Sequence, residues 1–160
     1  MLRSAVPADV PVILELIKGL AVYEREPDAV HVTEPMLHEA LFGPEPMAGV
    51  ELAIHEGADG SETAGMALWY RSYSTWTGPG LYLEDLFVRE EYRNHGYGKA
   101  LLRRLAEIAV QRGFARFEWS VLDWNQPSID FYLAMGAKAM DEWTRYRLEG
   151  QALRALSERA

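Results

Sequence analysis

The sequence predicts a single domain over residues 1–160, of mixed α/β class, with a six- to seven-stranded mixed sheet and helices on both faces. Three observations predict it. Strand-like and helix-like segments follow in the order β-α-α-β-β-β-α-β-α-β, which is typical of a mixed layered fold. No repeat, low-complexity segment or linker divides the chain. A chain of 160 residues can also bury one substantial core.

The N-terminal part predicts one short strand and two helices. Residues 2–5 are strand-like, and Asp9 is a residue type that favours a helix N-cap. Apolar residues then recur at helical spacing to about residue 23, where a charged, proline-containing segment follows. A second helix is predicted from residue 33 to Gly43, with Pro35 near its start.

A β-hairpin is predicted in the middle of the chain. Residues 50–56 alternate in polarity, Asp59-Gly60 is a strong turn signal, and residues 63–73 form the returning strand. Residues 74–80 are predicted to form a loop. The hairpin therefore leads directly to the next strand, at residues 81–88.

The C-terminal part predicts alternating short elements. A strand is expected over residues 115–122 and a helix over 128–135, ended by Gly136. Residues 137–148 should add one or two strands, and residues 151–160 a terminal helix or a frayed tail.

Composition and charge narrow the classes of function. The net charge of −8 argues against a nucleic-acid partner, which would require a basic face. No apolar run approaches the roughly 20 residues of a membrane span. The chain has no cysteine, and its four histidines share no ligand spacing, so we expect no metal site. Without a signal-peptide profile, we expect a cytoplasmic location.

Residues 81–112 are organised as a strand, a glycine-bearing loop and an amphipathic helix. Gly96 and Gly98 allow backbone N–H groups to converge before the helix, and Arg93 and Lys99 add positive charge. Such a junction suits a pyrophosphate. A tight turn without a ligand is the alternative. The third glycine of a dinucleotide fingerprint is absent, because Leu101 stands in its place.

Three separated motifs carry a resemblance to a known family. The pattern Arg-x-x-Gly-x-Gly after the strand LEDLFV resembles the acetyl-CoA loop of the GNAT superfamily of N-acetyltransferases. The pattern N-x-P-S-I-x-F-Y-x-x-x-G-A at residues 125–137, with LIKGLAVYE at 16–24 and LYLEDLFV at 81–88, resembles the spermidine/spermine (diamine) acetyltransferase branch. The resemblance runs from about residue 3 to residue 148.

The resemblance implies where acetyl-CoA would bind. It implies a central splay between the strand ending at Val88 and the strand ending near Leu122, with the pantetheine arm beside the backbone of the first strand. The implied cofactor-binding residues are Leu86, Phe87, Val88, Arg93, Asn94, His95, Gly96, Tyr97, Gly98, Lys99, Asn125 and Ser128.

The resemblance also implies direct transfer in a ternary complex to the primary amine of a small cationic substrate. A free alkylamine, with a pKa of about 10.4, must lose a proton first. Glu84 matches the implied base and Tyr132 the implied general acid. Unless a bulge turns both, Glu84 shares a face with Leu86, and Asp85 shares the other face with Phe87. The implied substrate-binding residues are Tyr23, Glu24, Trp76, Asp85, Glu118 and Glu142.

The chain departs from the branch at one implied substrate position. Polyamine-acetylating members carry an acid two residues before the tryptophan, where this chain has Ser74, and the segment between Gly136 and Trp143 is shorter. A polyamine, a diamine, thialysine or an amino-acid-like amine all stay open as substrates. The alternatives are a protein or peptide amine acetyltransferase and a non-catalytic acyl-CoA-binding regulatory module. The resemblance also implies a homodimer.

Overall fold

A computed structural model describes residues 1–58 and 60–158, and these residues fall into two compact units, Met1–Ser120 and Val121–Ala160. The strands are β1 (Leu2–Ser4), β2 (Ala48–Gly57), β3 (Gly60–Ser74), β4 (Gly78–Val88) and β5 (Phe117–Trp119). The helices are α1 (Val10–Tyr23), α2 (Glu34–Phe42), α3 (Tyr97–Gln111), α4 (Gln126–Ala134) and α5 (Gly150–Ser157), with short 3-10 helices η1 (Pro7–Asp9) and η2 (Glu90–Tyr92).

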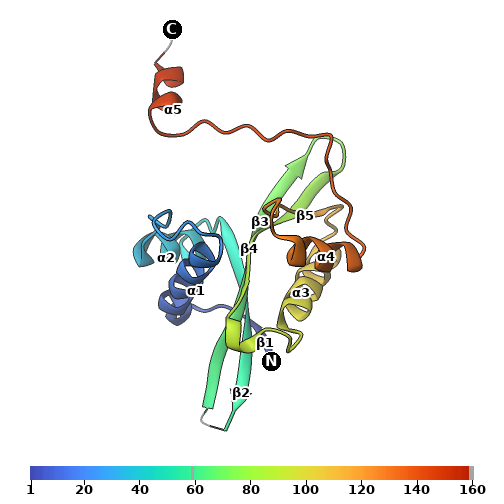
Figure 1. The fold of residues 1–160 in the computed structure, drawn as a ribbon. Helices are drawn as coiled ribbons and strands as arrows, with labels where there is room; N and C mark the ends of the chain where they lie inside the picture. The colour runs from blue at the N-terminus through green and yellow to red at the C-terminus, as the bar shows by residue number, and fades with distance from the viewer. Residues whose placement is uncertain (59, 159–160) are drawn as a thin grey trace. The chain divides into compact units, whose positions relative to one another are not determined.

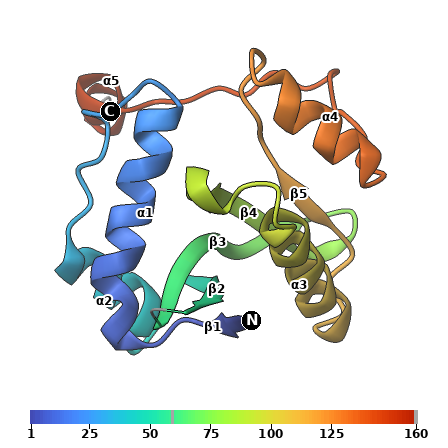
Figure 2. The same cartoon turned by 60° about the horizontal axis from the view of Figure 1, so that its bottom comes forward.

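The first unit is a mixed sheet with helices on both faces, as predicted. The strands lie in the order β1-β2-β3-β4-β5; all neighbours are antiparallel except β4 and β5, which run parallel. Helices α1 and α2 cover one face and α3 covers the other (Figure 1). Figure 2 shows the same unit from a direction in which α1 and α3 flank the sheet.

The core forms where α1 and α2 pack on the sheet. Ile13, Leu16 and Leu52 are fully buried or nearly so, and Leu68 and Phe87 pack against this cluster. The stripe of apolar residues that predicted α1 therefore faces the core. On the other face, the buried leucines of α3 pack at 101, 102 and 105. These two layers fix the positions of β3 and β4.

The predicted helices are confirmed, with one difference in how the first begins. Asp9 directly precedes α1, as predicted, but its carboxylate makes no capping bond to the helix. It accepts from the backbone N–H of Val6 at 2.7 Å and pairs with Arg3 at 2.6 Å. The bond to Arg3 lowers the pKa of Asp9. Helix α2 begins one residue after the predicted start at residue 33, because Thr33 is its N-cap and accepts from Met36 N–H at 3.5 Å.

The strand count differs from the prediction. The described residues form five strands, and residues 137–148, where one or two strands were expected, form none. Strand β5 is shorter than predicted, whereas β3 and β4 extend to a turn of only residues 75–77, where a longer loop was expected. Asp59 of the predicted Asp59-Gly60 turn and residues 159–160 of the predicted terminal segment lie outside the described residues.

The second unit contains α4 and α5. Asn125 is 6% exposed and caps α4 by accepting from the backbone N–H of Ser128 at 3.4 Å. Gly136 follows the helix with a left-handed φ of 88°, which explains why a glycine ends it. The predicted helix is thus confirmed with a slightly earlier start.

Close backbone packing at Gly65 holds the end of β4 in place. A Cβ added there would run into the carbonyl oxygen of Phe87 and lie 3.0 Å from Val88 Cα. We expect Gly65→Ala to lower the free energy of unfolding by about 1–3 kcal/mol, because the backbone of β4 must shift. Urea unfolding measures this. Gly57→Ala is the control, since its nearest contact would be an ordinary 3.5 Å; equal losses in both variants would contradict the prediction.

Candidate active site

The sheet opens between β4 and β5. The two strands pair only between Leu81–Leu83 and Phe117–Trp119, so β4 beyond Leu83 has a neighbour on one side alone. Arg89 N–H donates to Ala64 of β3 at 2.9 Å. Because N–H direction alternates along a strand, the N–H and C=O groups of Leu86 and Val88 face the open side. The splay implied by the resemblance is therefore present.

This open edge offers unpaired main-chain groups to an extended ligand. Of the three strand residues implied in cofactor binding, Leu86 presents its N–H and C=O there and Val88 its N–H, whereas Val88 O accepts from Arg93 Nε at 3.3 Å. Phe87 differs: its N–H is directed to β3, and its ring lies against Gly19 of α1, within 2.9 Å of where a Cβ would stand. Phe87 therefore contributes packing rather than hydrogen bonds at the edge.

The loop from Arg93 to Gly98 joins β4 to the N-terminus of α3. Asn94 and Gly96 have left-handed φ values of 64° and 81°. Gly96 is the N-cap of α3, and among the described residues no side chain caps this helix. Its first-turn N–H groups, at the positive end of the helix dipole, are thus available to an anion. The predicted anion-binding junction has the backbone geometry it needs.

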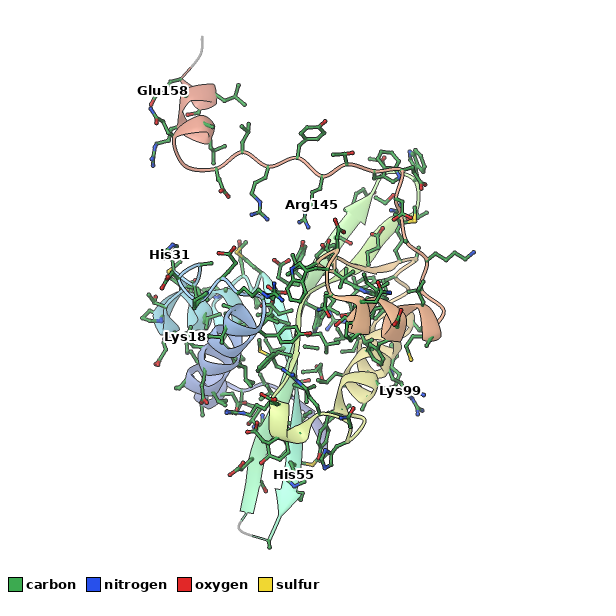
Figure 3. All side chains as sticks on the ribbon, in the orientation of Figure 1. Lys18, His31, His55, Lys99, Arg145 and Glu158 are labelled. Atoms are coloured by element: carbon green, nitrogen blue, oxygen red, sulfur yellow. The ribbon has the colours of Figure 1, made fainter. Side chains whose placement is uncertain are left out.

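The charged and aromatic side chains of this loop are held by the protein itself. Arg93 Nε donates to Val88 O at 3.3 Å, and its guanidinium lies 5.0 Å from the centre of the Tyr23 ring. His95 Nδ1 lies 2.9 Å from Arg93 O, and Tyr97 OH lies 2.9 Å from His55 Nδ1. Figure 3 labels His55 on β2 and Lys99, which is exposed, on α3.

A β-bulge determines where the two central acids lie. Leu68 pairs with Asp85 and Trp69 with Leu83, so Glu84 is an extra residue without a partner. Leu68 packs on the α1 side of the sheet. Trp69 lies on the α3 side, where the guanidinium of Arg112, a residue that follows α3, stands over its ring. Asp85 therefore lies on the α1 face with Leu68.

Glu84 also lies on the α1 face. The strand changes face between Leu83, on the α3 face, and Glu84, and the bulge keeps Asp85 on the same face as Glu84. The expectation that Glu84 shares a face with Leu86 is therefore wrong, and the bulge is the reason. The expectation that Asp85 shares a face with Phe87 is confirmed.

Glu24, Glu84 and Asp85 form a cluster of negative charge, hereafter the acidic triad. Burial and the negative charges of Glu84 and Glu24 raise the pKa of Asp85 to about 6. Burial also raises the pKa of Glu24, at the C-terminal end of α1. Glu84 is exposed. Cationic groups are attracted to such a cluster, and Asp85 exchanges a proton near neutral pH.

The far end of the same face carries a cation that the sequence analysis missed. Arg116 precedes β5 and contacts the β3–β4 turn: Nη2 donates to Ser74 Oγ and Nε to Thr77 Oγ1 at 3.0 Å. Nη1 pairs with Glu118 at 3.3 Å. Glu118, predicted to bind substrate, is thus already paired. Ser74, Thr77, Arg116 and Glu118 are hereafter the hairpin clamp.

Trp76 lies at the tip of the β3–β4 turn and is 83% exposed, and its backbone N–H donates to Ser74 Oγ at 3.1 Å. In the second unit, Tyr132 is half-buried, with its ring 5.5 Å from that of Phe131, and Glu142 is exposed. Asn125 and Ser128 are linked by the α4 cap. Roles for these residues in the reaction stay predictions, as does the homodimer.

Two absences concern the described residues only. No cluster of three or more His, Asp or Glu side chains among residues 1–58 and 60–158 is arranged to hold a metal ion. Nor does that part of the chain contain a helix long and apolar enough to cross a membrane.

Comparison with known proteins identifies the class. The model of the acetyltransferase (GNAT) family matches residues 17–137. The chain therefore belongs to this family, whose members use acetyl-CoA as co-substrate, and is an N-acetyltransferase.

The relatives then narrow the branch. The thialysine N-epsilon-acetyltransferase of Sus scrofa is 37% identical over 98% of this chain and 96% of that protein. The spermidine/spermine N(1)-acetyltransferase-like protein 1 of Homo sapiens is 35% identical over 95% of this chain and 23% of that protein. The predicted resemblance to the diamine acetyltransferase branch is confirmed. A solved integron cassette protein from the mobile metagenome of V. cholerae shares the fold, with a TM-score of 0.80, 24% identity and coverage of 99% and 98% of the two chains.

Proposed function

We propose that this enzyme acetylates the primary amine of a small cationic substrate, such as a polyamine, a diamine, thialysine or an amino-acid-like amine. The observation that carries this proposal is the position of the acidic triad: two of its members lie on β4 where the strand leaves β5. The thialysine-acetylating relative supports the same substrate class.

The residues present fit acetyl-CoA, which supplies the acetyl group as a thioester. The main-chain groups of Leu86 and Val88 would hold an extended pantetheine arm, and the N-terminus of α3 would hold the pyrophosphate. Arg93 adds positive charge beside the pantetheine arm and the pyrophosphate. Asn125 and Ser128 complete the set by resemblance to the family. Transfer is then direct, within a ternary complex.

The acidic triad has two tasks in this reaction. It attracts the substrate ammonium, and one member accepts the proton that the amine must lose. Glu84 is the base implied by the resemblance. The structure favours Asp85, because a base is most effective when its pKa lies near the working pH, and the pKa of Asp85 is raised to about 6. With both acids on one face, Glu84 then holds the ammonium. Tyr132, by resemblance, protonates the departing thiolate.

The test is thiol release from acetyl-CoA against a panel of amines: spermidine, spermine, putrescine, thialysine, lysine, an aminoglycoside and a lysine-containing peptide. We expect turnover of one or more small amines and a weaker response to the peptide. A response to the peptide alone would replace the proposal with the protein-acetyltransferase function. Silence across the panel, with acetyl-CoA binding detected by thermal shift, would favour the non-catalytic module.

A further inference from the structure

A cavity of about 320 Å³ lies in the first unit, where β1 ends beside the start of β2. Its walls come from β1, α2, β2, β3 and the C-terminal half of α3. Among the described residues, none that line it belong to β4, β5 or the loop from Arg93 to Gly98. The cavity is therefore separate from the candidate active site. Its volume falls at the lower end of the range for small-molecule sites.

The acid in this cavity is already neutralised. Glu51 is 3% exposed, and its two carboxylate oxygens have different partners. Oε1 accepts from Ser4 Oγ at 2.7 Å, and Oε2 accepts from Arg104 Nε at 3.0 Å. A buried carboxylate that is paired and hydrogen-bonded in this way has its needs met within the protein. Glu51 therefore does not make the cavity a site for a cation.

A second arginine of the lining has spare hydrogen-bonding capacity. The guanidinium of Arg112, an exposed residue, lies 4.9 Å from the centre of the Trp69 ring. Within the described part of the chain this is its one interaction, so its five N–H donors have no acceptor in the protein. Because Arg104 and Glu51 balance each other, Arg112 gives the lining a net positive charge, although the whole chain carries −8.

The Trp69 indole adds a buried donor to the same cavity. Trp69 is 7% exposed, and its Nε1–H has no hydrogen-bond partner among the described residues. Gly49, which also lines the cavity, lies against the part of the ring that carries this group: a Cβ added there would stand 3.1 Å from Nε1. A buried N–H without an acceptor is unfavourable. Since no hydrogen bond holds Arg112 over the ring, its side chain can move and let an acceptor reach Nε1.

The remaining wall suits a hydrocarbon group. Leu41 and Phe42, at the end of α2, line it together with Ile108 of α3. The C-terminal end of α3 does not repel an anion through free carbonyls, because the N–H groups of residues 112–114 donate to the carbonyls of residues 108–110 at 2.8–3.0 Å. One side of the cavity is thus cationic and rich in donors, and the other is apolar.

We propose that this cavity binds a small organic monocarboxylate. Its carboxylate lies between the Arg112 guanidinium and the Trp69 Nε1–H, and its hydrocarbon part lies against the apolar wall. The single negative charge matches the net charge of the lining, and a carboxylate accepts two parallel bonds from one guanidinium. An inorganic anion would leave the apolar wall without a contact. This inference is independent of the proposed function, because no lining residue takes part in that reaction.

The test is isothermal titration of the protein with benzoate while acetyl-CoA is present at a saturating concentration, so that the anion site at the N-terminus of α3 is already filled. We expect saturable binding with a Kd of about 0.1–1 mM, reasonable for so small a ligand. Benzamide has nearly the same shape without the charge and should bind at least about tenfold more weakly.

Two variants locate the site. Arg112→Gln should weaken benzoate binding by about 10- to 100-fold, and Trp69→Phe, which keeps a ring but removes the N–H, by about tenfold. Because Arg112 is exposed, its variant should keep the wild-type melting temperature. The control is Arg103→Gln, which removes an exposed arginine of α3 that pairs with Glu107 and does not line the cavity. It should bind benzoate as wild type does.

Four results would overturn the proposal. They are equal benzoate affinity in wild type and Arg112→Gln, equal wild-type affinity for benzoate and benzamide, and an equal loss in Arg103→Gln, which would reduce the effect to general charge. The fourth is no saturable binding up to about 10 mM benzoate. Binding that appears only without acetyl-CoA gives this fourth result and would assign the carboxylate to the co-substrate site.

Discussion

Asp85→Asn is expected to lower kcat/KM for the amine by about 10²- to 10⁴-fold at pH 7.5, the range for a general base. Asparagine keeps the shape of the side chain but cannot accept the substrate proton. Acetyl-CoA binding should be unaffected, because no main-chain group of the open β4 edge changes. Initial rates of thiol release, with a binding isotherm for acetyl-CoA, measure both quantities.

The pH dependence follows from the raised pKa of Asp85, about 6. A base must be ionised to accept a proton, so activity is present above this pKa and is lost as pH falls through about 6. Asp85→Asn should lack this limb. If instead Glu84→Gln removes the limb and Asp85→Asn keeps it, the base is Glu84, as the resemblance implies. Glu107→Gln, at an exposed acid of α3, is the control and should match wild type.

Asp85→Asn should also be more stable to unfolding than wild type. The pKa of Asp85 is raised on folding from 3.8 to about 6, so the folded state holds this proton more tightly than the unfolded state. Stability therefore falls as pH rises from about 4 to about 6, and the full cost remains above that range. Asp85→Asn removes the cost, a gain of roughly 1–3 kcal/mol at pH 7.5. Lower activity together with higher stability in Asp85→Asn would show that the Asp85 carboxylate serves catalysis at a cost in stability. An acid with a structural role would lose stability when replaced.

Tyr132→Phe is expected to lower kcat by about 10²- to 10⁴-fold, because the phenol proton is no longer available to the departing thiolate. Phenylalanine retains the ring and its packing beside Phe131. Affinity for acetyl-CoA and the melting temperature should therefore stay close to wild type. Single-turnover kinetics at saturating amine measure the chemical step.

Phe131→Leu, which alters the neighbouring ring without removing a proton donor, is the control for Tyr132. An unchanged kcat in Tyr132→Phe would show that solvent water, and not Tyr132, protonates the thiolate. A parallel loss of acetyl-CoA binding would mean that Tyr132 positions the co-substrate.

Periodicity and turn chemistry predicted most of the fold. The stripes of apolar residues in α1 and α3 were clear because each helix buries one face. Residues 137–148 were expected to add one or two strands and form none, because a segment forms a strand only where a neighbouring strand is present to pair with it, and residue types alone do not show that. The strand propensity of a segment depends on its packing against such a neighbouring strand.

The site was predictable where it is local in the chain. The loop from Arg93 to Gly98 and the cap of α4 are short motifs, and sequence spacing alone specified their backbone. The position of Glu84 depends on register with β3, which residue types do not reveal. Arg116 meets Ser74 from 42 residues away, so no local motif revealed this contact, which depends on how β5 lies beside the β3–β4 hairpin.

The unpaired state of Glu84 has a consequence for related chains. In a regular ladder each residue faces a partner, and removing one shifts all that follow. Deleting Glu84 would leave the pairs Leu83–Trp69 and Asp85–Leu68 as they are, so the sheet's pairing does not require this residue. Compared with a chain that has a regular strand here, Glu84 would align as a one-residue insertion rather than a substitution. A carboxylate can thus enter or leave this surface by a change in chain length, with no other side chain of β4 changing face.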